Sequence, residues 1–230
     1  MNKTEKKAII IILIVCVILL AATMLGKLLG KFRYEAHLDE AVVTVDDTEI
    51  SLREFGYYIY EVEAFVQEQA LLYDAENPKL WWNTHFMAGP DSQFIAHYAK
   101  QVAIETCVME EIYYQEALRE GIVLTDVEEA EAIAEAQKTM GAITQEQLDA
   151  TGLDQAIIVT MKKKEKTSVK YARYLVENQR IVGYSGNPEE LVNWDGAYYR
   201  EEVKPLHQVE TKDKLLDQIQ LGTITVNREP

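Results

Sequence analysis

Residues 42–60 read VVTVDDTEISLREFGYYIY, and this stretch decides how the fold begins. Its first four residues are all β-branched and Asp46-Asp47 favours a turn, so residues 42–50 predict a small strand or hairpin. Ser51 and Glu54 stand three residues apart, which is the spacing of a capping box at a helix start. The stretch therefore predicts a short β element that leads directly into a helix.

That helix is expected to be amphipathic, because apolar residues recur along it at steps of three and four. The stripe comprises Phe55, Tyr58, Ile59, Val62, Phe65, Val66, Leu72 and Tyr73, with Gln69 in the same register. We expect the whole stripe to pack against other parts of the protein.

Asn77-Pro78 ends the helical pattern, and the residues from there to Gly89-Pro90 show no clear period. This loop is rich in aromatic side chains, namely Trp81, Trp82 and Phe86. Aromatic residues in such a loop either contact an apolar partner or pack across helix ends as core. Both alternatives stay open from the sequence.

Three more helix starts follow. Asp91 or Ser92 can cap a second helix, and Gly121 suits the left-handed position that ends it. Capping boxes at Thr125 and Thr144 predict a third helix that stops near residue 141 and a short fourth helix.

A fifth helix is predicted from about residue 154 to residue 182. Its lysines are expected to face solvent, with contact to anionic lipid as the alternative; they are Lys162, Lys163, Lys164 and Lys166. A linker at 183–188 precedes a C-terminal segment, where residues 212–220 predict a helix and residues 223–226 are β-prone.

The sequence contains no recognisable catalytic pattern. Its four histidines are scattered without metal-ligand spacing, and neighbouring carboxylates such as Glu110-Glu111 do not converge on a helix. Cys107 has no histidine at a recognisable spacing and is expected to be buried. We therefore expect no catalytic residue, no metal site, no cofactor and no small-molecule substrate.

The charge is unevenly distributed. The formal net charge is −15, but residues 1–33 hold six Lys or Arg and one Glu, so residues 34–230 carry −20. A domain this acidic would be repelled by phosphate backbones, which excludes nucleic acid as an expected partner.

The basic N-terminal region contains an almost unbroken apolar run from Ala8 to Leu25, long enough to span a membrane as a helix. A cleaved signal peptide is the alternative, but Ala21-Ala22 offers no small-x-small cleavage pattern. We predict a retained single-pass anchor with the large domain outside the cytoplasm, since short basic tails usually stay inside.

Two stretches resemble the N-terminal chaperone domain of SurA/PrsA-type foldases. The first is residues 42–60, quoted above, and the second is residues 112–129, IYYQEALREGIVLTDVEE, a helix end and restart. This resemblance implies a helical domain that binds unfolded polypeptides, called clients below, and makes Trp81, Trp82 and Phe86 candidate client-binding residues. In longer relatives the C-terminal segment docks on that domain, and the sequence leaves open whether it does so here.

The sequence departs from the family in two ways. Asp46-Asp47 stands where the family commonly has Asn-Gly. The strands and Gly-rich turns of a parvulin prolyl-isomerase module are missing, and residues 183–230 are too few to hold one. The resemblance therefore implies client binding without isomerase activity.

The expected architecture is mainly α, with residues 1–33 as cytoplasmic tail and anchor, 34–182 as the helical chaperone domain and 183–230 as linker and C-terminal segment. The expected function is a membrane-anchored extracytoplasmic chaperone. A subunit that grips one dedicated partner is the first alternative, and a family member with residual isomerase activity is the second.

Overall fold

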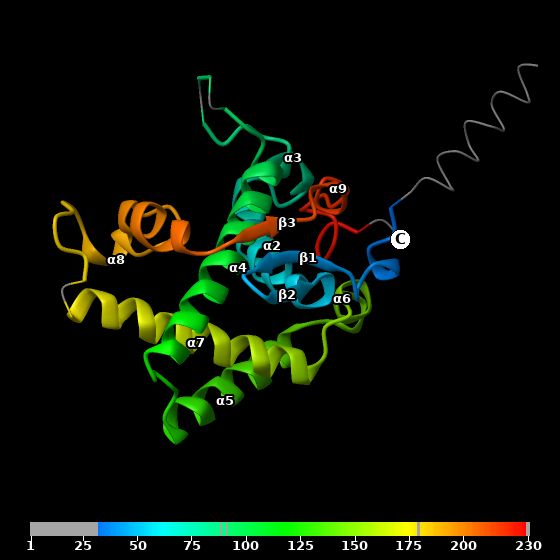
Figure 1. The fold of residues 1–230 in the computed structure, drawn as a ribbon. Coiled ribbons are helices and arrows are strands. Elements are labelled where there is room, and N and C mark those ends of the chain that lie inside the picture. Colours follow the sequence, from blue (N-terminus) through cyan, green and yellow to red (C-terminus); the bar gives the residue numbers. More distant parts are fainter. Residues whose placement is uncertain (1–31, 88, 91, 179, 229–230) are drawn as a thin grey trace, which may run out of the picture. The chain divides into compact units, whose positions relative to one another are not determined.

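The computed structural model describes residues 32–228 except 88, 91 and 179, and the described residues from Tyr34 onward form one compact unit (Figure 1). In chain order the elements are η1 (Tyr34–Ala36), β1 (Ala41–Val45), β2 (Thr48–Ser51), α2 (Leu52–Tyr73), α3 (Lys79–Trp82), α4 (Ile95–Arg119), α5 (Asp126–Ala142), α6 (Gln145–Thr151), α7 (Gln155–Glu177), α8 (Pro188–Leu191), η2 (Tyr199–Val203), η3 (Lys204–Leu206), β3 (Val209–Thr211) and α9 (Asp213–Leu216). The expectation of a mainly helical domain with a small β element is confirmed.

Local capping sets the helix starts that the sequence predicted. Ser51, Thr125 and Thr144 each accept a hydrogen bond from the backbone N–H three residues on, and each capping box is complete. Each satisfies backbone donors that would otherwise lack a partner at a helix start. Gly121, which follows the end of α4, has φ +71° as expected.

Other boundaries differ from the prediction. The second helix begins at Ile95, after an N-cap residue, Phe94, that has no side-chain cap, and not near Ser92. The fifth helix ends at Glu177, earlier than predicted. Residues 223–226 form no strand, and the last helix covers only Asp213–Leu216.

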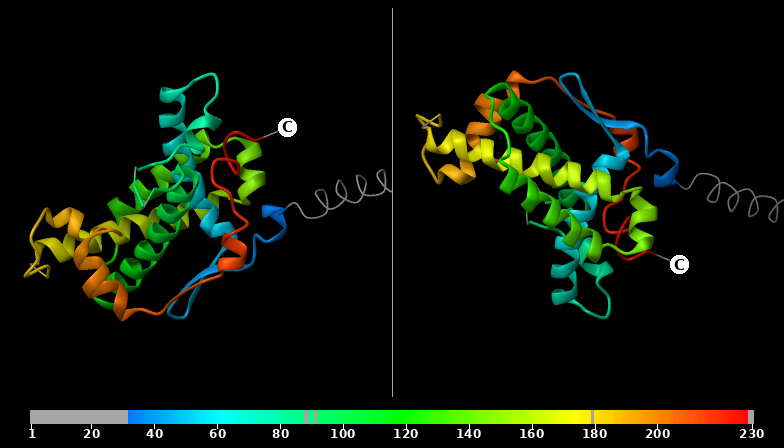
Figure 2. Two further views of the ribbon diagram at one scale, coloured as in Figure 1. Left: turned by 90° about the horizontal axis from the view of Figure 1, so that it is seen from above. Right: turned by 90° about the horizontal axis from the view of Figure 1, so that it is seen from below.

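The helical body is built around α4, which α2 and α7 contact, with α5 packed along α7 (Figures 1 and 2). The largest fully buried side chains include Phe55, Ile59, Ile112, Tyr113 and Ile158, which come from α2, α4 and α7. Cys107, on α4, is buried as expected.

The lysine run of α7 does not form a solvated face, which corrects the prediction. Lys164 pairs with the buried Glu111 of α4 at 2.5 Å, and the side chains of Lys162 and Lys164 are only 12% and 11% exposed. Lys163 and Lys166 reach glutamates of α5. Lys162 and Lys164 face inward because the neighbouring helices present carboxylates that need a partner, whereas Lys163 and Lys166 form exposed pairs.

A third strand, which the sequence did not indicate, completes the sheet. The strand order is β2-β1-β3, with both neighbours antiparallel to β1. Asp46, in the β1–β2 turn with φ +52°, accepts hydrogen bonds from the Gln208 backbone N–H and from His207 Nδ1 at 2.8 Å. These bonds lower the pKa of Asp46. Asp46 thus fixes the entry to β3.

The end of the chain is held by one buried carboxylate, that of Glu63 on α2. Its Oε1 accepts the backbone N–H groups of Gly222, Thr223 and Ile224, and its Oε2 accepts the backbone N–H and the hydroxyl of Thr225, at 2.5 to 3.2 Å. Residues 222–225 with Glu63 are called the C-terminal clamp below. The clamp joins the segment after α9 to the first long helix.

No helix among residues 32–228, within the described part of the chain, is long and apolar enough to cross a membrane. The anchor predicted from Ala8 to Leu25 lies outside the described residues.

Candidate functional site

One part of the domain exposes apolar side chains in a concentrated way. It comprises the second half of α2, α3 and the loop that leads to α4, residues 65–94, and is called the arm below. Figures 1 and 2 show α3 and this loop standing out from the helical body. Its large exposed apolar residues are Phe65, Leu71, Leu72, Tyr73, Leu80, Phe86, Met87 and Phe94.

The apolar stripe of α2 is therefore only half buried, which corrects the expectation that all of it packs. Phe55 and Ile59 are fully buried, whereas Phe65 is 66% exposed and Leu72 is 82% exposed. Phe65 and Leu72 are seven residues apart, so they lie on the same face of the helix. Concentrated exposed apolar residues of this kind mark a site of interaction.

Ring contacts give the arm a defined shape. The rings of Tyr73 and Trp81 lie 4.9 Å apart, which joins the end of α2 to α3. Phe86 stacks on Tyr98 of α4 with a centroid distance of 4.3 Å and an interplanar angle of 12°. The Phe86 N–H also donates to the carbonyl of Gln93, so the two sides of the loop are hydrogen-bonded. The surface is preformed.

The three aromatic residues singled out in the sequence lie in different environments. Trp82 is buried, its Nε1 donates to Gln67 Oε1 at 2.9 Å, and its ring packs against Gly222 of the C-terminal clamp. Trp81 is half-buried against Tyr73, and Phe86 is 47% exposed. The structure thus buries Trp82 at the base of the arm and leaves Trp81 and Phe86 partly exposed on its surface.

A second group of interest is a polar network between α2, α4 and α7. The Tyr58 hydroxyl donates to Glu110 Oε2 at 3.0 Å, and the Tyr57 hydroxyl donates to Glu165 Oε2 at 2.7 Å. Burial, with the nearby charge of Glu165, raises the pKa of Glu110 to about 8. A carboxyl with a raised pKa is a candidate acid or base, but Glu110 already accepts a hydrogen bond from the Tyr58 hydroxyl.

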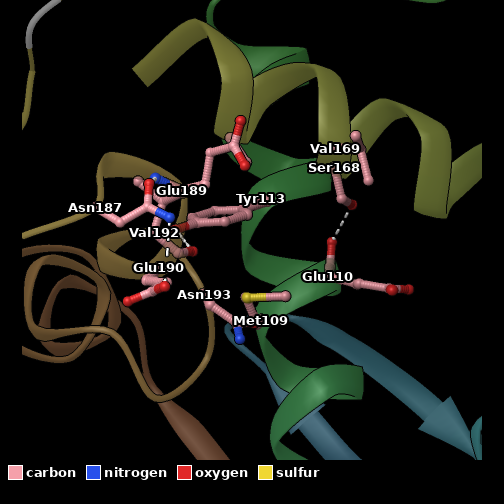
Figure 3. A pocket seen from close by; sticks show the side chains of 11 residues that line it. Met109, Glu110, Tyr113, Ser168, Val169, Asn187, Glu189, Glu190, Val192 and Asn193 are labelled. Atoms are coloured by element: carbon pink, nitrogen blue, oxygen red, sulfur yellow. Dashed lines mark hydrogen bonds between the residues drawn. The ribbon is translucent and has the colours of Figure 1, made fainter. Parts of the chain in front are cut away.

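A pocket of about 290 Å³ lies between α4, α7 and the segment around α8 (Figure 3). Met109, Tyr113 and Val169 contribute its apolar lining, and the carboxylate of Glu110 points away from it. The Ser168 hydroxyl donates to the Glu110 carbonyl, and the Tyr113 hydroxyl donates to the Val192 carbonyl. These groups hold the helices together, and the described lining residues do not pair a nucleophile with a base.

No family model, no curated protein and no solved structure matches the chain. The function is therefore inferred from the chemistry of its own residues. Among the described residues, no group of His, Cys, Asp or Glu is placed to hold a metal ion.

Sequence reasoning missed the exposed half of the α2 stripe. One signal was available: apolar residues at 71, 72 and 73 are consecutive, so they cannot all lie on the buried face of one helix. The loop after α2 also has no helical period, so no long amphipathic element was predicted nearby to cover them.

Proposed function

We propose that the chain is a membrane-anchored, extracytoplasmic chaperone that reversibly binds unfolded polypeptide segments on the arm. The exposed apolar surface around Phe65, Leu72 and Phe86 carries this proposal, because such a surface is stable in water only at a cost that binding a client would remove. The mechanism is burial of client side chains without covalent chemistry.

Two further observations support the proposal. In longer members of the foldase family that the sequence resembles, the C-terminal segment docks on the helical domain, and here β3 and the C-terminal clamp likewise pack on elements of the first half of the chain. The acidic surface keeps such a protein soluble while it exposes apolar residues. The predicted N-terminal anchor would keep the arm close to chains that emerge from a secretion channel.

The direct test is suppression of aggregation of a chemically denatured reporter enzyme by the full chain. We expect protection by the wild type and its loss in the double variant Phe65→Ser/Leu72→Ser. Both side chains are largely exposed, so the fold should persist. Leu206→Ser is the matched control, because Leu206 is 81% exposed but lies on η3, outside the arm. Absence of protection at several-fold molar excess would count against the proposal.

A subunit that grips one dedicated partner is the second candidate. The preformed shape of the arm, with Phe86 stacked on Tyr98, favours it because a fixed surface suits a defined partner. Affinity capture of bound proteins by the wild-type chain distinguishes the two candidates. Many captured proteins at low occupancy indicate a chaperone, and one protein at unit stoichiometry indicates a dedicated subunit.

Protease treatment of intact cells tests the orientation, since an extracytoplasmic domain would be cleaved.

A further inference from the structure

We propose that the surface that holds residues 221–227 of this chain is a polypeptide-binding site, and that a client segment with the pattern apolar-Gly-x-x-Thr/Ser enters it in place of these residues. Residues 221–227 are called the tail loop below. The side chains that hold it are called the tail site, and they are Glu63, Gln67, Trp82 and Gln147. The inference rests on the proposed function, and it names the class of client segment from the contacts of the tail loop.

The tail loop is held largely through its backbone. None of residues 217–228, all of which the structure describes, belongs to a helix or a strand. Four successive backbone N–H groups, those of residues 222–225, converge on the carboxylate of Glu63. Gln147 of α6 donates from Nε2 to the carbonyl of Thr225 at 2.9 Å. Polypeptides of any sequence carry such backbone groups, so these contacts do not demand one particular sequence.

Side chains specify three positions of the tail loop. Gly222 has φ +91°, and a Cβ there would lie 2.6 Å from the ring of Trp82, so glycine alone fits without strain. Thr225 is buried, and its hydroxyl donates to Glu63 Oε2 at 2.5 Å. Leu221, directly before the glycine, is buried as well, whereas the two residues between glycine and threonine are more exposed. These contacts define the pattern of the segment.

The buried carboxylate sets the chemistry of the occupant. Glu63 is fully buried and accepts five hydrogen bonds from the tail loop, four from N–H groups and one from a hydroxyl. An occupant must supply a row of donors to restore these bonds, as successive backbone N–H groups do around an anion. A phosphate or another anionic group would be repelled by the carboxylate. The expected partner is therefore a polypeptide.

The tail site adjoins the apolar surface of the arm, because Gln67 and Trp82 are themselves residues of the arm. Gln67 Oε1 accepts hydrogen bonds from Trp82 Nε1 at 2.9 Å and from Asn227 Nδ2 at 3.0 Å, so one side chain links the arm to the tail loop. A polypeptide bound by the exposed apolar residues of the arm is thus held close to the tail site. This raises its local concentration, which favours its entry in competition with the tail loop.

The test measures binding of a labelled peptide with the sequence of residues 217–228 to the full chain in phosphatidylcholine nanodiscs, by fluorescence anisotropy. The tail loop of the chain competes with the peptide, so weakening the tail loop should strengthen binding. Thr225→Val removes the hydroxyl bond to the carboxylate and leaves the tail site unchanged, and it should tighten binding roughly tenfold. Thr223→Val is the matched control and should bind like the wild type, because the Thr223 hydroxyl donates to the Gln220 carbonyl and not to the tail site.

Further measurements use the wild-type chain and vary the peptide. Peptides that carry Gly222→Ala or Thr225→Val should bind roughly tenfold more weakly than the parent peptide, and a peptide that carries Thr223→Val should bind equally. A peptide of unrelated sequence that keeps only the leucine, the glycine and the threonine of the pattern should displace the parent peptide. With the chain labelled by ¹⁵N, the bound peptide should lower the hydrogen-exchange protection of the chain's own amides at 222–225 and leave those of α4 unchanged.

Four results would overturn the inference. They are equal affinity of the Thr225→Val and Thr223→Val chains, equal affinity of the parent and Gly222→Ala peptides, absence of peptide binding, and co-capture of two differently tagged copies that the peptide reverses, which would identify the tail loop of a second copy as the occupant. None of these results refutes the proposed function, because the reporter-aggregation assay contains no peptide. Peptide binding as expected without protection of the reporter would refute the proposed function, and with it the assignment of the site to clients.

Discussion

Replacing Glu63 with alanine should release the C-terminal clamp. The carboxylate is fully buried and accepts four backbone N–H groups and one hydroxyl from residues 222–225. Gly222 and Thr225 are buried, so their N–H groups would lose their partner away from water, at about 1–3 kcal/mol each. The other two donors are more accessible and can turn to water.

An opposing contribution reduces this cost. Burial raises the pKa of Glu63, which shows that the folded state disfavours its charge, and alanine removes that penalty. We therefore expect a net loss of about 3 kcal/mol in the free energy of unfolding. This is a large share of the 5–15 kcal/mol that is typical of folded domains.

The assay combines urea unfolding, followed by circular dichroism, with hydrogen exchange of residues 219–228. Glu63→Ala should lower the urea midpoint and abolish protection of the amides at 222–225. Trp82 should become more exposed to water, because its ring packs on Gly222. Glu68→Ala, at an exposed position of the same helix, should change stability by less than about 0.5 kcal/mol. An unchanged midpoint together with intact protection in Glu63→Ala would refute the reasoning.

Three further perturbations test other contacts. Gly222→Ala should lower the free energy of unfolding by about 2–4 kcal/mol, because φ at this position is +91° and the added Cβ would lie 2.6 Å from a ring carbon of Trp82. Gly121→Ala is the control, since φ is +71° but no atom lies near its Cβ. It should lower the free energy of unfolding by only about 1–2 kcal/mol in the same urea assay. Lys164→Met should lower the free energy of unfolding by about 3–5 kcal/mol, because it leaves the buried carboxylate of Glu111 without its partner. Lys163→Met breaks an exposed pair and should lower it by less than about 1 kcal/mol. Equal shifts in melting temperature for the two variants would contradict this. The fold raises the pKa of Glu110 from its ordinary value of 4.5 to about 8. Its contribution to the free energy of unfolding is therefore full below pH 4.5 and is lost as pH rises to 8. Urea midpoints between pH 6 and pH 9 should fall less steeply in Glu110→Gln than in the wild type.

The parts of the fold that the sequence predicted correctly depend on neighbours in the chain. A capping box joins residues three apart, so Ser51, Thr125 and Thr144 mark helix starts without any knowledge of tertiary contacts. The start of α4 was missed for the same reason, because Phe94 caps it without a side-chain hydrogen bond. No local residue pattern identifies such a start.

The parts that could not be predicted depend on residues far apart. Glu63 and Thr225 are 162 positions apart, and nothing near either residue indicates the other. Lys164 was expected in solvent because a run of lysines usually is, and only its position opposite Glu111 reverses this. The arm combines both cases: its aromatic residues were noticed, but the exposure of Phe65 and Leu72 depends on which elements fail to cover α2.

The place of β1 at the centre of the sheet imposes an order on folding during synthesis. The β1–β2 hairpin and α2 leave the ribosome early, but β3 begins more than 150 residues after the end of the hairpin. Until then one edge of β1 has no partner and Glu63 has no donors, so the nascent domain stays open and prone to aggregation. Closing so long a loop is also slow. A protein proposed to bind unfolded chains thus depends on protection from aggregation itself until β3 has been synthesised.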